Sequence, residues 1–354
     1  MQEKVLMKGN EAIAEAAILA GCRHYFGYPI TPQTEVAAYM SKKMPKIGGT
    51  FLQAESEIAA INMVYGVSST GHRVMTSSSS PGIALKCEGI SYLAGADLPA
   101  LIVNVQRGGP GLGGIQPSQS DYHLATKGPG HGDFHVLCFA PASVQEMADL
   151  TAHAFDLAEK YRMPAMLLAD GTMGQMMEPV VLPEPTEKSE NDLSWAVSGT
   201  ECKREHHIIN SLYLSPAELE KLNIARFDRY KVIEEKEAMW EEFMMDDAEI
   251  CIVSYGITAR ISRNAIVEAR KQGIKVGMIR PITVWPFPKK PLLEAAEKVK
   301  GFISVELNMG QMKDDIELAI KCKKPVELCF RVGGMIPSPD EVLEQIKKMN
   351  GGKE

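Results

Sequence analysis

The stretches HYFGYPITP (residues 24–32), TFLQAESEIAA (50–60) and LIVNVQRGGPG (101–111) share one arrangement. In each of them an apolar run of strand type gives way to a helix or to a glycine-rich turn. Apolar runs without polar alternation are typical of parallel strands that are covered on both faces. In open parallel α/β sheets, ligands bind at the edge where the strands end. The three stretches therefore predict one rim that carries a hydroxyl, an acidic pair and a guanidinium.

Helical and strand patterns alternate from residue 8 to about residue 170. The predicted strands are 24–28, 50–53, 73–77, 99–105, 136–140 and 164–169. The predicted helices are 9–22, 32–44, 55–69, 81–94 and 143–161. This alternation predicts a doubly wound parallel α/β sheet of about six strands.

A second alternating unit follows a break in the pattern. Residues 178–198 are proline-bearing without periodicity, which indicates a covering strap or linker, and residues 203–246 are charged and helix-prone. Later strands are predicted at 249–255, 275–279, 301–305 and 325–330, and later helices at 258–272, 291–299, 311–321 and 338–349. We expect a first domain at 1–195, a charged helical linker at 196–246 and a smaller α/β domain at 247–354.

Composition limits the class of protein. The 354 residues suffice for two domains with proper cores, and the net charge of −7 implies no general affinity for nucleic acid or anionic membranes. The N-terminus lacks the apolar core of a signal peptide, and no apolar run approaches the length of a membrane span. Seven scattered cysteines without a Cys-x-x-Cys pair predict free thiols in a reducing cytoplasm, and they lack the spacing of an iron–sulfur site.

The acidic pair Glu55 and Glu57 falls in the first turn of a predicted helix. Because the two residues are two positions apart, their side chains point to nearly opposite sides of the helix. One interpretation is compensation of the helix dipole. The other is a carboxylate buried against a heteroaromatic cofactor, for which Ala59 and Ala60 would leave room.

Arg107 directly follows an apolar strand, so its side chain should emerge at the carboxyl edge of the sheet. The planar guanidinium can donate two parallel hydrogen bonds to a carboxylate, which suits a carboxylate substrate. The alternative is a structural ion pair with Asp97 or Asp121. Thr31 lies in a turn before the next predicted helix, where the commoner role of a threonine is that of an N-cap.

Three further motifs carry weaker signals. The glycine-rich stretch 108–114 lacks the ending of a phosphate loop, so a mobile lid or a close backbone approach fits it better. His131 and His135 have no carboxylate or cysteine array beside them, and polar contacts or a subunit interface suit them better than a metal. The serine run 77–80 lacks the surrounding glycines of a nucleophile elbow.

Taken in order, these motifs resemble the alpha subunit of anaerobic 2-oxoacid:ferredoxin oxidoreductases. The stretches that carry the resemblance are 28–32, 53–57, 77–82, 107–110, 131–133, 254–256, 286–288 and 306–311. The resemblance covers nearly the whole chain apart from residues 203–246. It implies a thiamine-diphosphate pyrimidine-binding domain followed by a transketolase-C-terminal-like domain.

The resemblance also implies the roles of site residues. In this family a glutamate contacts the aminopyrimidine ring of the cofactor and shares a proton with a ring nitrogen. Glu57 is the expected catalytic residue, since Gly66 follows it at the nine-residue spacing that thiamine enzymes generally have. Thr31 and Arg107 would bind the carboxylate and carbonyl of a 2-oxoacid. The remaining cofactor-binding residues implied in this way are Tyr28, Pro29 and Ile30.

Two parts of a complete enzyme are missing from the sequence. It contains no Gly-Asp-Gly followed downstream by Asn, and it lacks cluster cysteines. The resemblance therefore implies a beta subunit that holds the diphosphate and Mg²⁺, and a ferredoxin-like iron–sulfur subunit with 4Fe-4S clusters. Ferredoxin would accept the electrons and coenzyme A the acyl group. The expected assembly is a dimer of hetero-oligomers.

Residues 111–113 point to a subtype. They read Gly-Leu-Gly, where the 2-oxoglutarate subtype usually carries hydroxyl residues. Together with residues 116–121 and 173–177, they resemble the branched-chain subtype, which oxidatively decarboxylates 2-oxoisovalerate (3-methyl-2-oxobutanoate) to acyl-CoA and CO₂. Two alternatives stay open: a 2-oxoglutarate enzyme with the same mechanism, and a non-catalytic scaffold subunit.

Overall fold

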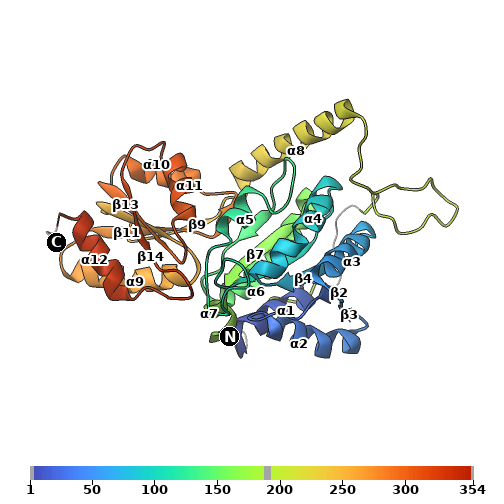
Figure 1. Ribbon diagram of the computed structural model, residues 1–354, viewed down its shortest axis with the longest axis horizontal. Coiled ribbons are helices and arrows are strands. Elements are labelled where there is room, and N and C mark those ends of the chain that lie inside the picture. Colours follow the sequence, from blue (N-terminus) through green and yellow to red (C-terminus); the bar gives the residue numbers. More distant parts are fainter. Residues whose placement is uncertain (1–3, 187–192, 352–354) are drawn as a thin grey trace.

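The computed structural model describes residues 4–186 and 193–351, which form two α/β units. Figure 1 shows the N-terminal unit in blue to green and the C-terminal unit in orange and red, with the long helix α8 (Pro216–Lys236) running beside them. Residues 187–192 of the expected strap lie outside the described residues.

Within the described residues, the N-terminal unit is built on a sheet of seven strands in the order β12-β6-β7-β5-β4-β2-β3. The strands from this half are β2 (His24–Gly27), β3 (Thr50–Gln53), β4 (Val74–Ser78), β5 (Leu101–Gln106), β6 (Leu137–Phe139) and β7 (Ala165–Asp170). All six pair in parallel, as predicted. Since β4, β5 and β7 are buried along their whole length, both faces of the sheet are covered.

The covering helices also follow the predicted alternation. They are α1 (Gly9–Leu19), α2 (Thr34–Lys43), α3 (Glu57–Ser69), α4 (Ser80–Gly95) and α6 (Val144–Tyr161). Helix α1 packs against α2 and α6, and α3 packs against α4. The helix predicted from Glu55 begins at Glu57 instead, because Ser56 is its N-cap and accepts a hydrogen bond from the Ala59 amide at 3.2 Å.

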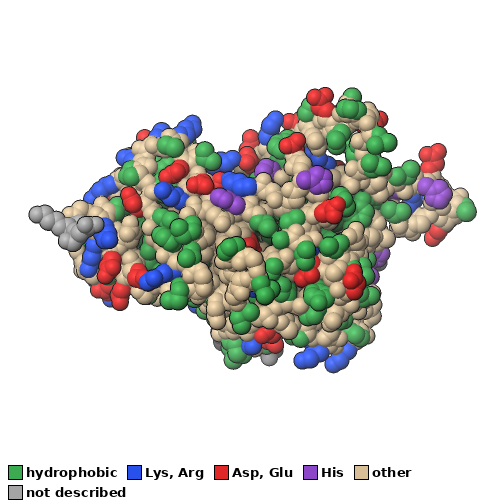
Figure 2. Space-filling view, viewed as in Figure 1, with side chains coloured by type: hydrophobic (Ala, Val, Ile, Leu, Met, Phe, Trp, Pro, Cys, Tyr) green, Lys and Arg blue, Asp and Glu red, His purple; other side chains and the backbone are tan. Residues whose placement is uncertain are grey.

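The C-terminal unit has a second sheet in the order β14-β13-β10-β11-β9. Its elements are β9 (Trp240–Phe243), β10 (Ile250–Ser254), β11 (Val276–Pro281), β13 (Gly301–Glu306), β14 (Val326–Phe330), α9 (Gly256–Lys271), α10 (Lys289–Ala296), α11 (Gln311–Ala319) and α12 (Pro339–Met349). The predicted strands pair in parallel. Figure 2 shows charges of both signs interspersed over this unit.

Two antiparallel strands were not predicted by the alternation, and the second of them joins the two units. β9, from the segment expected to be a helical linker, pairs antiparallel with β11. β12 (Thr283–Trp285) leaves the C-terminal half and pairs antiparallel with β6 of the first sheet. The domain boundaries given above stay a prediction.

Several short elements were not expected. They are β1 (Val5–Lys8), β8 (Met177–Val180), α5 (Tyr122–Lys127), α7 (Gly171–Gln175) and the 3₁₀ turn Met44–Ile47. β1 and β8 form a separate antiparallel pair. No helix in the described ranges combines the length and apolar character needed to cross a membrane.

A polar seam holds the two units together. The buried side chain of Gln119 donates to the Tyr255 carbonyl at 2.9 Å and accepts from the Leu307 amide at 3.0 Å. The Tyr122 hydroxyl donates to Asp315 at 2.7 Å. Because these buried groups satisfy one another across the seam, the relative placement of the units is specified by directional bonds.

We predict that Gly89→Ala destabilises the protein by about 1–3 kcal/mol, because a Cβ there would lie 2.4 Å from Cγ2 of Ile61 and push α4 away from α3. Urea unfolding of the purified protein measures this change. Gly66→Ala on α3 is the matched control: nothing lies within 4 Å of its Cβ, so helix propensity should stabilise the variant by about 0.5–1 kcal/mol. Equal unfolding midpoints for the two variants would contradict the close approach.

Candidate active site

Glu57 is the first residue of α3 and is 6% exposed, whereas Glu55 lies before the helix on the surface. The two side chains therefore point to opposite sides, as predicted. The Glu57 carboxylate lies against α4 at Gly82, where an added Cβ would be 2.6 Å from Oε1 of Glu57 and 2.1 Å from Oγ of Ser78. The absence of a side chain at Gly82 makes the room that the carboxylate occupies.

The turn from Ser77 to Gly82 connects the Glu57 side of the site to the Arg107 side. On the Glu57 side, the hydroxyls of Ser78 and Ser79 are buried and have no hydrogen-bond partner among the described residues. On the other side, the Ser80 hydroxyl lies 3.1 Å from the Arg107 amide, which donates to it. Buried hydroxyls without partners are uncommon in folded proteins, and they mark a place where a further polar group fits.

Arg107 is 7% exposed and draws two loops together. Its Nη1 donates to the Thr31 carbonyl at 3.0 Å and its Nη2 to the Leu112 carbonyl at 2.9 Å. Its Nε is buried and has no partner within the described part of the chain. The guanidinium therefore holds the two loops together and still has an N–H group at Nε that donates to no described residue.

The ion pair considered for Arg107 does not form in the described residues. Asp97 pairs with Arg229 at 2.6 Å. Asp121 instead accepts hydrogen bonds from Ser80 at 2.5 Å and from Asn104 at 2.9 Å. Burial raises the pKa of the Asp121 carboxyl, and these two hydrogen bonds offset part of that rise.

Thr31 meets Arg107 through its backbone carbonyl, and its side chain is exposed. The N-cap role considered for Thr31 is wrong, because α2 begins at Thr34 with Gln33 at the N-cap. Tyr28 and Pro29 are exposed and Ile30 is half-buried, so this stretch forms an accessible rim beside Arg107.

The glycine-rich stretch is a close backbone approach. Gly114 donates to the Gly108 carbonyl at 3.0 Å, and Gly108 donates to the Gln116 carbonyl at 2.9 Å. Gly113 has φ +59°, and a Cβ there would lie 1.8 Å from the Gly108 oxygen. Leu112 at the tip of this loop is 84% exposed.

A cleft of about 680 Å³ opens between the units at this edge. The N-terminal unit contributes Arg107, Asp121 and the glycine-rich loop, and the C-terminal unit contributes residues 307–309 and 332–333. Two of the stretches that carry the resemblance, 107–110 and 306–311, both line this cleft. Asn308 of the second stretch donates to the Gln119 carbonyl at 2.8 Å. The cleft thus combines one guanidinium with one buried acid.

Lys86 is the residue of this site that sequence reasoning missed. It is completely buried in α4, and its Nζ donates to the Thr76 hydroxyl at 2.9 Å. Burial lowers the pKa of Lys86 to about 8, and the charge of Glu57 opposes that shift. The signal was present, because Lys86 occurs in an apolar helical run on the same face as Gly82 and Gly89.

The histidines do not form a metal centre in this structure. His131 is exposed and its Nδ1 lies 3.3 Å from Oγ of Ser91, while the ring of His135 stacks on Trp285 with centroids 4.7 Å apart. In residues 4–186 and 193–351, no group of three or more side chains is suited to hold a metal ion.

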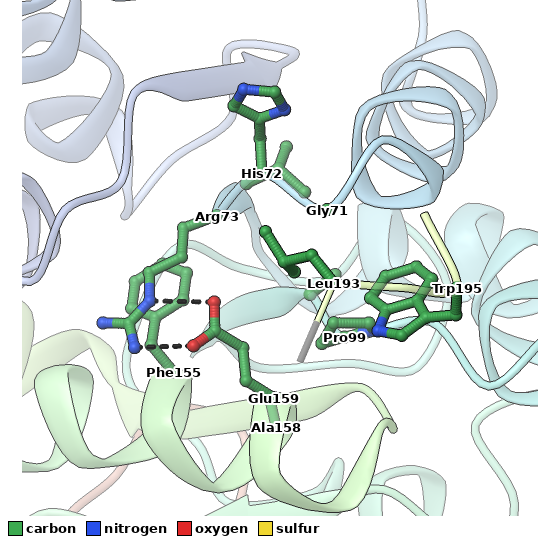
Figure 3. Close-up of a pocket in the computed structure, with 11 residues that line it drawn as sticks. Gly71, His72, Arg73, Pro99, Phe155, Ala158, Glu159, Leu193 and Trp195 are labelled. Atoms are coloured by element: carbon green, nitrogen blue, oxygen red, sulfur yellow. Dashed lines mark hydrogen bonds and ion pairs between the residues drawn. The ribbon is translucent and has the colours of Figure 1, made fainter. Parts of the chain in front are cut away.

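A small cavity of about 20 Å³ lies elsewhere, between residues 71–74 and α6. Figure 3 shows Arg73 paired with Glu159 beside it, and Arg73 also donates to the Ala20 carbonyl at 2.5 Å. The guanidinium of Arg73 is therefore paired within the chain and leaves no unmatched charge beside this cavity.

Comparison with known proteins identifies the family. Residues 15–230 match the thiamine-diphosphate-binding region of pyruvate flavodoxin/ferredoxin oxidoreductases, and residues 248–342 match core domain II of pyruvate:ferredoxin oxidoreductase. The ketoisovalerate oxidoreductase subunit VorB of Methanothermobacter thermautotrophicus is 50% identical over 346 residues, which are 98% of each chain. The 2-oxoglutarate synthase subunit KorA of Methanothermobacter marburgensis is 36% identical and covers 99% of this chain and 100% of that one.

Solved structures agree with these matches. A 2-oxoglutarate:ferredoxin oxidoreductase from Magnetococcus marinus, with 2-oxoglutarate, coenzyme A and succinyl-CoA bound, superposes with a TM-score of 0.86 at 28% identity over 98% of this chain. The present chain spans 65% of that chain's length. A split-gene transketolase at 12% identity and a TM-score of 0.60 shares the fold alone. With two family matches and full-length relatives, the resemblance read from the motifs is confirmed, and this chain belongs to the family of 2-oxoacid:ferredoxin oxidoreductase subunits.

Proposed function

We propose that this chain binds the aminopyrimidine side of thiamine diphosphate in a CoA-acylating 2-oxoacid:ferredoxin oxidoreductase. The reaction would convert 2-oxoisovalerate and related branched-chain 2-oxoacids to acyl-CoA and CO₂ with reduction of ferredoxin. The observation that carries this proposal is the buried carboxylate of Glu57, seated against Gly82 beside hydroxyls that have no partner in the described residues.

The residues present fit the cofactor's aminopyrimidine ring. A planar heteroaromatic ring needs a carboxylate opposite a ring nitrogen and small polar groups at its edge. Glu57 would supply the carboxylate, Ser78 and Ser79 the edge contacts, and Tyr28 to Ile30 the accessible rim. When bound, thiamine diphosphate supplies the nucleophilic carbon that adds to a 2-oxo group.

Glu57 would hold and share one proton at its carboxylate. Its burial excludes water, so a proton placed between the carboxylate and a ring nitrogen has few competing acceptors. The Ser56 cap fixes the start of α3 and thereby the direction in which Glu57 points. The catalytic contribution of this chain is therefore positioning and proton affinity.

The cleft suits a 2-oxoacid with an aliphatic tail. Arg107 would bind the substrate carboxylate through the N–H groups that do not donate to the loop carbonyls. Thr31, whose carbonyl accepts from Arg107, would approach the same carboxylate from the exposed rim. Asp121 on the same cleft would repel a second carboxylate on the substrate. Leu124, Leu307, Met309 and Val332 give the lining of the cleft an apolar part.

A partner chain would complete the cofactor site, since this sequence has no Gly-Asp-Gly motif for the diphosphate and Mg²⁺. Figure 2 shows apolar side chains on the surface of the N-terminal unit. Four large apolar side chains on the elements next to Glu57 are exposed: Tyr28 after β2, Leu52 on β3, Ile58 on α3 and Leu85 on α4. Such a patch suits a permanent neighbour. That neighbour would be a beta subunit holding the diphosphate and Mg²⁺, joined in the cytoplasm by an iron–sulfur subunit with 4Fe-4S clusters in a dimer of hetero-oligomers.

We predict that Glu57→Gln lowers kcat of the assembled complex by about 10²–10⁴-fold, because an amide cannot share the proton. Steady-state reduction of ferredoxin with 2-oxoisovalerate and coenzyme A measures this effect. Glu55→Gln is the control, since Glu55 is exposed and lies outside α3, and its rate should stay within about twofold. An unchanged rate in Glu57→Gln would instead identify the chain as a scaffold.

Arg107→Lys should raise KM for the 2-oxoacid by about 10–100-fold, because a lysine cannot bond the Thr31 and Leu112 carbonyls and a substrate carboxylate together. Arg263→Lys, which alters an ion pair with Glu241 in the C-terminal unit, serves as the control. Initial rates over a range of 2-oxoacid concentrations separate KM from kcat. A normal KM in Arg107→Lys would exclude this substrate role.

Substrate preference tests the subtype. The complex should use 2-oxoisovalerate with kcat/KM at least about tenfold above 2-oxoglutarate, since the cleft offers one guanidinium and, in Asp121, a carboxyl that disfavours a second carboxylate. Competition between the two substrates, followed by the acyl-CoA products, measures the ratio directly. A preference for 2-oxoglutarate would overturn the subtype in favour of the relatives that share 36% identity.

A further inference from the structure

Met309 is a large apolar side chain with little cover. It is 69% exposed, and it lines from the C-terminal unit the same cleft of about 680 Å³ that Arg107 lines from the N-terminal unit. Single exposed apolar side chains are common on protein surfaces, so exposure alone assigns no role to Met309. Two further features distinguish it: the turn that carries it is fixed, and that turn is tied to the backbone of Arg107.

The turn at Met309 is fixed by the residues on both sides. Asn308 is 2% exposed, and its Oδ1 accepts hydrogen bonds from the amides of Gly310 and Gln311, each at 2.8 Å. Gly310 has φ +95°, a conformation that glycine adopts readily and other residues rarely. The backbone on either side of Met309 is therefore held in one conformation, and its side chain starts from a defined point in the cleft.

Contacts between three chain segments set the span from this turn to Arg107. Arg107 forms an isolated antiparallel bridge with Pro117. The next residue, Ser118, donates from its hydroxyl to the Leu307 carbonyl at 3.4 Å. Two lateral steps of strand spacing thus separate the backbones of Arg107 and Leu307 by roughly 10 Å. Met309, two residues further on, lies within the combined reach of an arginine side chain and a small 2-oxoacid.

The two ends of this span differ in chemistry. At one end Arg107 offers N–H groups, whereas the lining residues 307–309 and 332–333 carry no charged side chain. Leu124 of α5 adds another apolar side chain to the lining. A 2-oxoacid has the same division, since its carboxylate and oxo group adjoin at one end and its substituent forms the other. The thioether of Met309 is polarizable and flexible, which suits contact with a branched tail.

We propose that Met309 is a specificity-determining residue: its side chain receives the aliphatic end of the 2-oxoacid while Arg107 holds the carboxylate. The inference rests on the proposed function of the cleft, and it assigns recognition of the substrate tail to the C-terminal unit. Met309 takes no part in proton transfer. Its contribution is apolar contact, so its effect depends on the length and charge of the substituent that reaches it.

The first test compares substrates of different tail length in the assembled complex. Met309→Ala should lower kcat/KM for 2-oxoisovalerate by about tenfold, because the lost contacts equal at least those of one methylene group in an apolar pocket. The value for pyruvate, whose single methyl group does not reach Met309, should stay within about twofold of the wild type. Initial rates of ferredoxin reduction at limiting 2-oxoacid measure both.

Two variants control this test. Leu318→Ala removes a side chain that is 70% exposed on α11 and lies outside the lining of the cleft, so both kcat/KM values should match the wild type. Met309→Leu keeps an apolar side chain of similar volume and should hold the ratio of the two values within about threefold of the wild type. Equal losses on both substrates in Met309→Ala would overturn the proposal.

The second test changes the charge at the same position. Met309→Arg places a second guanidinium in the cleft, where it can bond the distal carboxylate of 2-oxoglutarate. The ratio of kcat/KM for 2-oxoglutarate to that for 2-oxoisovalerate should rise at least about tenfold over the wild-type ratio, as expected for a hydrogen bond between charged groups. Competition between the two substrates, followed by their acyl-CoA products, measures the ratio.

A contact with a partner chain is the other use that an exposed methionine could have. In that case Met309→Ala would weaken assembly and leave the substrate ratio at the wild-type value. Sedimentation of the purified complexes measures assembly. Loss of assembly in Met309→Ala but not in Leu318→Ala counts against the proposal, whereas a fully assembled Met309→Ala complex with a changed ratio supports it.

The two hypotheses fail separately. A Glu57→Gln complex with full activity refutes the proposed function. An active wild type and an inactive Glu57→Gln, together with wild-type substrate ratios in both Met309→Ala and Met309→Arg, refute only the role of Met309.

Discussion

The close approach of α3 to α4 is the constraint on which the site depends. Without side chains at Gly82 and Gly89, the two helices come near enough for Ile61 and Glu57 to fill the space between them. A carboxylate is thereby buried at the edge of a parallel sheet, where water would otherwise surround it. The same face of α4 carries Lys86, which is fully buried and donates to the Thr76 hydroxyl of β4 at 2.9 Å.

A second constraint builds the cleft from two distant parts of the chain. Gln119 and Asn308 exchange hydrogen bonds with backbone groups across the seam between the units, and few of these groups face water. Arg107 then ties the loops at Thr31 and Leu112 to the N-terminal side of that seam. Directional bonds between buried polar groups are costly to break, which gives the cleft a defined shape.

Much of the fold and part of the site could be predicted because the signals are local. Uninterrupted apolar runs marked the parallel strands, and the two-residue spacing of Glu55 and Glu57 correctly indicated that one faces outward and the other inward. The prediction that α3 begins at Glu55 is two residues early. The side chain of Ser56 caps the helix, so Glu55 lies before its first turn. The site roles of Thr31, Arg107 and Glu57 remain proposals that the geometry supports.

The sequence by itself determined the alternation of strands and helices, the rim on which the motifs lie and the family to which the chain belongs, since periodicity and motif order need no long-range information. Only the tertiary structure decided that β12 crosses into the first sheet, that Arg107 bonds the Thr31 and Leu112 carbonyls and that Lys86 is buried against Thr76. These contacts join residues far apart in the chain. Their geometry depends on how closely whole helices and loops pack, which no local pattern encodes.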